Sequence, residues 1–215
     1  MNNNFPDIQN INDSCNPCIY SPNSPTALYL NQNYEVFEDV DTYKRFLKNA
    51  ESLFRHSRSY KTIKSEIMKL GLNKCQINGN ITDEMATLEM HHTILTLFDV
   101  ALLISEHTLR TSGLVNTLYI SKMLKQEHKD FHVPLVILDK TNHQLYHNTN
   151  ELYIPPSMVI GDWYTLLQKY KYGITKEIAY KIIDYLSLAE QEEDVEKNKI
   201  LAIRENVLDW SYYNY

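Results

Sequence analysis

The chain has 215 residues, 43% of them hydrophobic and 22% charged, which is typical of one soluble globular domain or of a domain with an appended helical piece. A formal net charge of −6 argues against a protein that coats nucleic acid nonspecifically, and three cysteines exclude a disulfide framework and favour a reducing cytoplasm. No apolar run approaches the roughly 18 to 20 residues of a membrane helix, and the N-terminus lacks the basic start and apolar segment of a secretory signal.

Residues 1–35 are rich in asparagine, proline and serine and show no periodicity. We therefore expect an extended or disordered arm, which orders only on a partner if it orders at all. Cys15 and Cys18 form a C-x-x-C pair in this arm. One such pair without a second is more often a chance spacing in a loop than a zinc or redox site.

Residues 36–80 are predicted to form a basic helical segment. Apolar residues recur every three or four positions from Val40 to Phe54, which predicts an amphipathic helix. A second helix is expected over Tyr60–Leu70, with Gly71 just past its end in the usual terminating position.

The charge of this segment differs sharply from that of the rest. Between positions 43 and 74 nine basic and two acidic residues give +7, which leaves −13 for the remainder of the chain. A block this basic either contacts phosphates or forms two solvated helix faces, and the sequence favours neither interpretation.

Residues 81–172 mix strands with helices, and residues 173–215 are expected to hold C-terminal helices and an aromatic tail. Thr96 and Asp99 have the spacing of a capping box, and Gly113 closes the helix that they open. The expected elements, in chain order, are the strand Met85–His92, the helices Leu97–Arg110 and Asn116–Phe131, the strand Pro134–Asp139, a short helix Asn142–Asn148 capped by Thr141, a small strand Glu151–Pro155, a turn at Gly161, and the helices Asp162–Tyr170, Thr175–Gln191 and Glu192–Val207. The predicted fold class is α+β: mostly helical, with a small ββα core and an extended N-terminal arm.

Seven of the eight histidines fall between His91 and His147. His91 and His92 end the first strand; successive strand residues point to opposite faces, so one of them could bind a metal while the other faces a substrate. His143 and His147 are four residues apart on one face of the short helix, a spacing by which two imidazoles can share an ion. Glu89, two positions before His91, could support that histidine or lie on the surface of an edge strand.

The stretch "EMHH" and the later stretch "VPLVILDKTNHQLYH" resemble the two halves of the HNH (His-Me finger) nuclease motif. They are also similar to phage-encoded HNH-like proteins, through Glu89, His91, His92, Thr96, Leu97 and Asp99 in the first half and Pro134, Leu135, His143, Leu145 and His147 in the second. The resemblance implies a His-Me finger-like ββα region over residues 81–172 with a helical insertion. It also implies that His91, His143 and His147 bind one divalent metal ion and that His92 is the general base.

The function implied by this resemblance is that of a metal-dependent DNA endonuclease, encoded by a phage and active in the host cytoplasm. His92 would take a proton from water, and the ion (Mn, Ni, Zn or Mg) would stabilise the pentacoordinate phosphorus. Asn142 would orient the base or the scissile phosphate. The residues that would hold the DNA backbone are Arg55, Arg58, Lys61 and Lys64.

Two other functions fit the same sequence. The first is a phage protein that keeps the HNH fold without turnover and serves as a nucleic-acid- or protein-binding subunit of a larger assembly, with the arm and tail holding phage or host proteins. The second is an acidic inhibitor or adaptor of host machinery, whose histidines are buried imidazoles satisfied by Glu89, Asp99 or Asp139. His107, His128 and His132 are expected at helix surfaces or ends, without a functional role.

Overall fold

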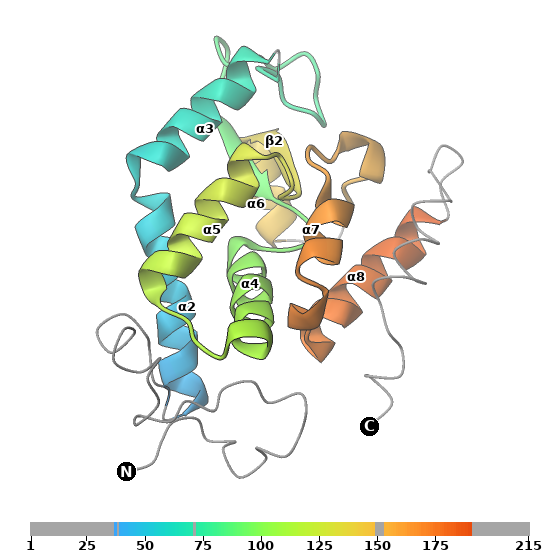
Figure 1. Cartoon of the computed structure of the whole chain (residues 1–215). Coiled ribbons are helices and arrows are strands. Elements are labelled where there is room, and N and C mark those ends of the chain that lie inside the picture. The colour runs from blue at the N-terminus through green and yellow to red at the C-terminus, as the bar shows by residue number, and fades with distance from the viewer. Residues whose placement is uncertain (1–36, 38, 71, 149–152, 191–215) are drawn as a thin grey trace, which may run out of the picture.

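A computed structural model of the chain describes residues 37, 39–70, 72–148 and 153–190 (Figure 1). Its elements, in chain order, are α2 (Val40–Arg55), α3 (Arg58–Lys69), β1 (Leu88–His92), α4 (Leu97–Ser112), α5 (Thr117–Lys129), β2 (Leu135–Asp139), α6 (Lys140–Asn148), η2 (Pro156–Met158), α7 (Trp163–Lys169), η3 (Lys171–Gly173) and α8 (Lys176–Ala189). This is the predicted α+β class, a mostly helical body with a two-stranded antiparallel sheet.

The two strands are distant in sequence and adjacent in space. β1 pairs with β2 in antiparallel register from Leu88 opposite Asp139 to His92 opposite Leu135. Two helices, α4 and α5, are inserted between the strands, and α6 follows β2 directly and packs against both strands. β1, β2 and α6 therefore form a ββα unit, and the helical body covers it (Figure 1).

Side-chain caps fix where the helices begin and end. The predicted capping box is present, since Thr96 Oγ1 accepts from the amide of Asp99 and Asp99 Oδ2 accepts from the amide of Thr96. α4 ends at Gly113, whose φ of 77° lies in the left-handed region that glycine adopts without strain. The local signals in the sequence thus place both ends of α4 correctly.

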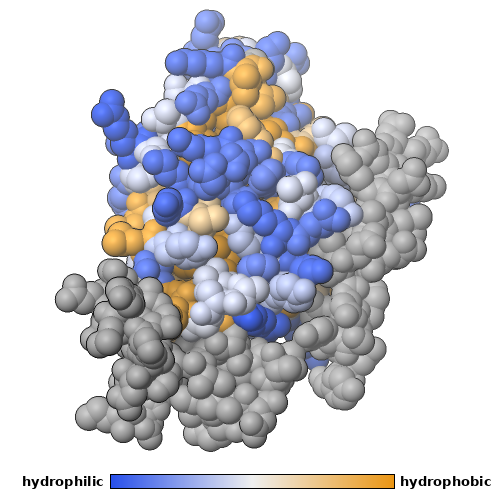
Figure 2. Space-filling model, viewed as in Figure 1, coloured by the Kyte–Doolittle hydropathy of each residue, from blue (hydrophilic) through white to orange (hydrophobic). Residues whose placement is uncertain are grey.

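One hydrophobic core joins α2, α3, α4, α5, α7 and α8, and its members run from Phe37 to Ala189. A smaller cluster of Val136, Leu138 and Ile154 lies on the other side of β2. Both faces of β2 are therefore buried, as its continuous apolar sequence indicates. On the face seen in Figure 2, hydrophilic side chains cover most of the described surface and apolar side chains appear as separate patches.

Two local predictions were wrong. The helix α6 begins at Lys140, and its cap is Asp139, whose Oδ1 accepts from the amides of Thr141 and Asn142 at 2.9 and 3.1 Å. Thr141 is therefore inside the helix. The described part of the expected strand Glu151–Pro155 has no strand structure, because two prolines lead into the turn η2; only Ile160, five residues later, bridges to β2.

Several predictions lie outside the described residues: the N-terminal arm with Cys15 and Cys18, the stop at Gly71, the helix Glu192–Val207 and the aromatic tail. Among the helices that are described, none combines the length and apolar character needed to cross a membrane.

Candidate metal centre

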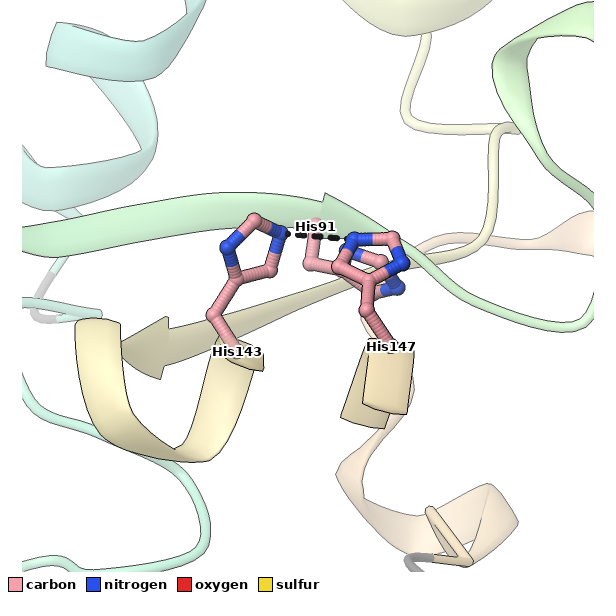
Figure 3. A group of neighbouring side chains, drawn as sticks. All are labelled: His91, His143 and His147. Atoms are coloured by element: carbon pink, nitrogen blue, oxygen red, sulfur yellow. Dashed lines mark hydrogen bonds between the residues drawn. The ribbon is translucent and has the colours of Figure 1, made fainter. Parts of the chain in front are cut away.

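The ββα unit brings three of the predicted site residues together. His91 lies near the end of β1, and His143 and His147 lie one turn apart on α6 (Figure 3). Their potential ligand nitrogens all lie within 4.8 Å of one another, and Nε2 of His143 is 3.2 Å from Nε2 of His147. The ring centroids are 4.7 to 4.8 Å apart with interplanar angles of 67° to 82°, so each imidazole contacts the other two edge to face. We call these three residues the histidine triad.

The triad ranges from the protein interior to the surface. His91 is 7% exposed, His143 is half-buried and His147 is exposed. The Nε2 atom of His91 is buried and has no hydrogen-bond partner among the described residues. A buried polar atom of this kind costs free energy unless a ligand satisfies it.

The chemistry of the triad fits a divalent transition metal. Burial, with the neighbouring charges of His143 and His147, lowers the pKa of His91 to about 4, so its lone pair is available at neutral pH. Three imidazole ligands match the preference of zinc, nickel or copper, whereas magnesium and calcium prefer oxygen ligands. The residues present therefore fit such an ion.

A carboxylate orients one member of the triad. Glu89 precedes His91 by two positions and shares its strand face, but its Oε2 lies 2.5 Å from Nδ1 of His143 rather than on His91. A proton on Nδ1 leaves Nε2 of His143 as the lone-pair nitrogen, the usual arrangement of a metal-binding histidine. Tyr146 lies between the two helix histidines in the sequence. The centroid of its ring is 4.5 Å from that of His91, and its hydroxyl lies 3.3 Å from Thr93 Oγ1.

Replacing Glu89 with glutamine is expected to weaken zinc binding about 10- to 100-fold, because the amide no longer fixes the tautomer of His143. Glu84→Gln, an exposed glutamate before β1, is the matched control and should bind as the wild type does. Isothermal titration calorimetry measures both. Equal affinity of the Glu89→Gln and wild-type proteins would show that Glu89 has no positioning role.

His92 is not part of the triad. β1 is still paired at this residue, so the side chain points to the opposite face from His91 and into the interior. Its Nε2 lies 2.8 Å from Nε2 of His128, and His128 Nδ1 donates to the carbonyl of Leu124 at 2.6 Å. The lone pair of a neutral His128 is then on Nε2 and accepts from His92. Burial holds the pKa of His92 well below its ordinary value, and both rings are neutral.

Asn142 and the basic residues are also separate from the triad. The amide of Asn142 donates to Asp139 Oδ2 and lies 3.7 Å from Cys75 Sγ, at the start of α6. Arg55 is paired with Glu51 at 2.9 Å, yet its charge reaches His91 and lowers that pKa. Arg58 and Lys61 are exposed on α3, and Lys64 is half-buried.

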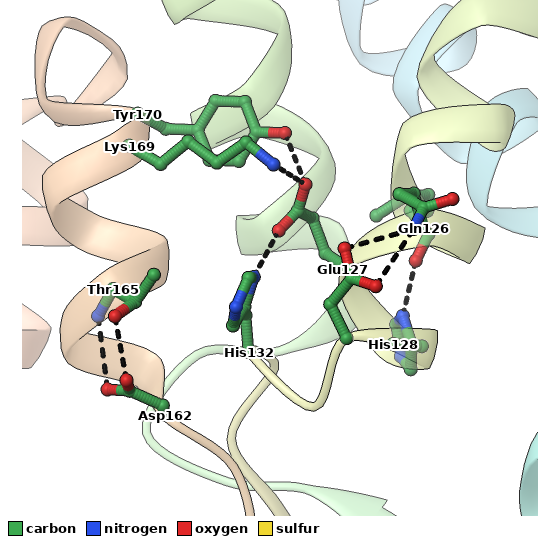
Figure 4. Close-up of polar contacts among 10 residues, drawn as sticks. Gln126, Glu127, His128, His132, Asp162, Thr165, Lys169 and Tyr170 are labelled. Atoms are coloured by element: carbon green, nitrogen blue, oxygen red, sulfur yellow. Dashed lines mark hydrogen bonds and ion pairs between the residues drawn. The ribbon is translucent and has the colours of Figure 1, made fainter.

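A second group of possible ligands has a different role. The carboxylate of Glu127 is fully buried, and it already accepts from His132 Nδ1 at 2.8 Å, from Lys169 Nζ at 2.6 Å and from the Tyr170 hydroxyl at 2.7 Å (Figure 4). Burial would raise the pKa of Glu127, but these three hydrogen bonds outweigh it and lower the pKa. Because an ammonium group already compensates the carboxylate, we interpret this group as a structural link from α5 to α7.

Sequence reasoning did not identify two residues of this region, His128 and Tyr146. His128 was expected at a helix surface or end but is fully buried, and the signal was available, since Ile120, Leu124 and His128 recur every four residues along one face of α5. Tyr146 follows His143 by three positions and therefore shares its helix face.

A family model described as "Bacteriophage G278-like virion protein" matches residues 9–213 of the chain. No curated protein and no solved structure gives a significant match.

Proposed function

The chain belongs to the bacteriophage G278-like virion protein family, and from this premise we propose that it is a virion subunit that binds one divalent transition-metal ion through His91, His143 and His147. A virion protein works in association with other phage proteins, so the ion would belong to a subunit of a larger assembly. The proposal makes the chain a metal-binding relative of the HNH fold that has given up turnover.

The observation that carries the proposal is the buried, unpartnered Nε2 of His91 beside two further imidazoles. An ion satisfies all three nitrogens at once, whereas hydrogen bonding between neutral histidines satisfies them only in pairs. Three imidazoles from a strand and a helix match the three-ligand type of site, which keeps a position open for water or another donor.

The position of His92 supports the loss of turnover. A general base has to reach the attacking water directly or through one water molecule. His92 instead donates to His128 in the interior and is 6% exposed. Its lowered pKa also makes it a weak proton acceptor at neutral pH.

The proposal is tested by the metal content of the purified full-length protein. We expect one zinc or nickel ion per chain after loading and desalting, measured by inductively coupled plasma mass spectrometry. His143→Ala should lose the ion, because two imidazoles bind far more weakly than three. Gln144→Ala, an exposed neighbour on α6, is the matched control and should retain it. A wild-type protein that binds no ion under any loading condition would refute the proposal.

The second candidate function is that of an active HNH-type DNA endonuclease. It is favoured by the order β1, β2, α6, with a histidine near the end of the first strand and two on the helix, as the resemblance to HNH nucleases implies. The exposed basic side chains of α2 and α3 (Arg55, Arg58 and Lys61, together with the half-buried Lys64) would then contact DNA phosphates.

Plasmid nicking with Mn, Ni, Mg and Zn separates the two candidates. The virion-subunit proposal predicts no metal-dependent nicking by the wild type. Nicking that is lost in both His92→Ala and His143→Ala would establish the nuclease, with His92 moving to the ion during turnover. Nicking that persists in both variants would come from a contaminant.

A further inference from the structure

Among the described α-helices, α6 has unusually thin packing. None of residues 140–147 is buried, whereas the still shorter α7 buries Leu166 and Leu167. Isolated helices below about 12 to 15 residues are marginal in water, and most helical stability in proteins comes from burying an apolar face. A nine-residue helix without a buried side chain among residues 140–147 therefore needs another source of stability.

The face that α6 turns toward β1 is polar and aromatic rather than aliphatic. It consists of His143, Tyr146 and His147, at the i, i+3 and i+4 positions of one stripe. Helices of the main core present leucine and isoleucine at such positions, as α8 does with Ile178, Ile182 and Leu186. The contact of α6 with β1 is thus made by two members of the triad and by Tyr146.

Hydrogen bonds and an ion pair hold the start of α6. Asp139 caps the first turn by accepting from the amides of Thr141 and Asn142, and Glu89 pairs with His143. Toward the C-terminal end, Tyr146 packs on the cluster of Val136, Leu138 and Ile154, and its hydroxyl lies 3.3 Å from Thr93 Oγ1. The rings of Tyr146 and His147 both contact His91 there. The last turn is therefore held by Tyr146 and by the triad, whereas the first turn has the Asp139 cap as well.

We propose that ion binding at the histidine triad docks α6 on β1, so that α6 is an ion-controlled helix that opens when the ion is removed. The inference rests on the proposed metal site and adds that the bound ion stabilises the position of α6. His91 comes from the sheet and the other two ligands from the helix, so an ion held by all three cross-links the two elements. Opening of α6 breaks the site, and for that reason the ion has to stabilise the docked state.

The size of the effect follows from linkage. If the open form does not bind the ion, the equilibrium between docked and open α6 shifts by a factor of one plus the free ion concentration divided by Kd. At about 100 times Kd, exchange of the α6 amides through local opening should slow about 100-fold.

Hydrogen exchange measured by mass spectrometry on the full-length protein tests the inference, with zinc and with EDTA. We expect peptides covering α6 to exchange about 100-fold more slowly in zinc, and peptides covering α8 to change little, because α8 is anchored by the main core. His143→Ala should remove the zinc effect on α6, and Gln144→Ala should keep it.

The outcomes separate this inference from the proposed function. A wild-type protein that binds one zinc ion by mass spectrometry but shows the same α6 exchange in zinc and EDTA would overturn the ion-controlled helix and leave the metal site standing. A protein that binds no zinc would overturn both. Slowing of α6 exchange that survives in His143→Ala would assign the effect to zinc bound elsewhere, and would also overturn the inference.

Discussion

Acidification from pH 7 to pH 4.5 in EDTA is expected to lower the free energy of unfolding by about 2 kcal/mol through His128 alone. His91 and His92, whose pKa values are also lowered, add losses in the same direction. EDTA removes any contribution from the release of a bound ion. Urea unfolding followed by circular dichroism at several pH values measures the change.

The direction follows from the buried imidazole pair. Burial lowers the pKa of His128 to about 4 in the folded protein, against an ordinary value of 6.5 in the unfolded chain. Between these values the unfolded chain binds more protons, so stability rises with pH and is lost as pH falls from 6.5 toward 4. Glu127 has a lowered pKa and loses its contribution only below the ordinary carboxyl value of 4.5, so the window above pH 4.5 reports the histidines.

Replacing His92 and His128 together isolates their contribution to the pH dependence of stability. In His92→Leu/His128→Leu the hydrogen bond and both titrating groups are removed together, and the loss between pH 7 and pH 4.5 should shrink by more than half. His56→Gln, at the exposed end of α2, should behave as the wild type does. If the double variant loses as much stability as the wild type over this range, the buried pair is not the origin of the pH dependence.

Replacing Gly173 with alanine is expected to lower the free energy of unfolding by about 3 kcal/mol or more. η3 packs on α4 so closely that a Cβ at this position would lie 1.8 Å from the carbonyl oxygen of Leu103 and 2.7 Å from the amide nitrogen of His107. Both atoms belong to the backbone of α4, which cannot move aside without breaking its own hydrogen bonds. The variant can fold only by lifting η3 from α4.

Gly79→Ala is the control for this substitution, because a Cβ there meets no atom within 4 Å. Its effect should stay within about 0.5 kcal/mol. Urea denaturation compares the two variants with the wild type. Equal midpoints for Gly173→Ala and Gly79→Ala would mean that η3 does not pack on α4 as described.

Much of the ββα unit could be predicted from the sequence, because its signals are local. The spacing of His143 and His147 places them on one helix face. His91, near the end of the first strand, lies beside them once the two strands pair. The capping box at Thr96 and the glycine that ends α4 are likewise set by neighbouring residues. The triad therefore assembles despite the two helices inserted between its halves.

The orientation of His92 could not be predicted in the same way. The residue would have been free to turn toward the triad if β1 ended at His91, and the sequence does not specify where strand pairing stops. In the structure His92 is still paired with Leu135, and alternation then directs it to the opposite face. Its partner His128 comes from α5, 36 residues away, and such a contact depends on tertiary packing rather than on local pattern.

The histidine that Glu89 contacts could likewise not be predicted from the sequence. Strand alternation correctly puts Glu89 on the face of His91, but which histidine it reaches depends on the position of α6 across the sheet. The contact of Asn142 with Asp139, three residues earlier, is by contrast a local one at the start of α6. The sequence thus specifies the strand face of Glu89, and the packing of α6 specifies which histidine Glu89 contacts.

X-ray absorption spectroscopy of the zinc-loaded full-length protein tests the central claim most directly, because it counts and identifies the ligands of the ion. We expect three imidazole nitrogens at about 2.0 to 2.1 Å from zinc, and a reduced imidazole count in His147→Ala. A zinc ion coordinated by sulfur at about 2.3 Å would place the metal on cysteine, with Cys15 and Cys18 as the candidate pair, and would contradict the histidine triad as the metal centre.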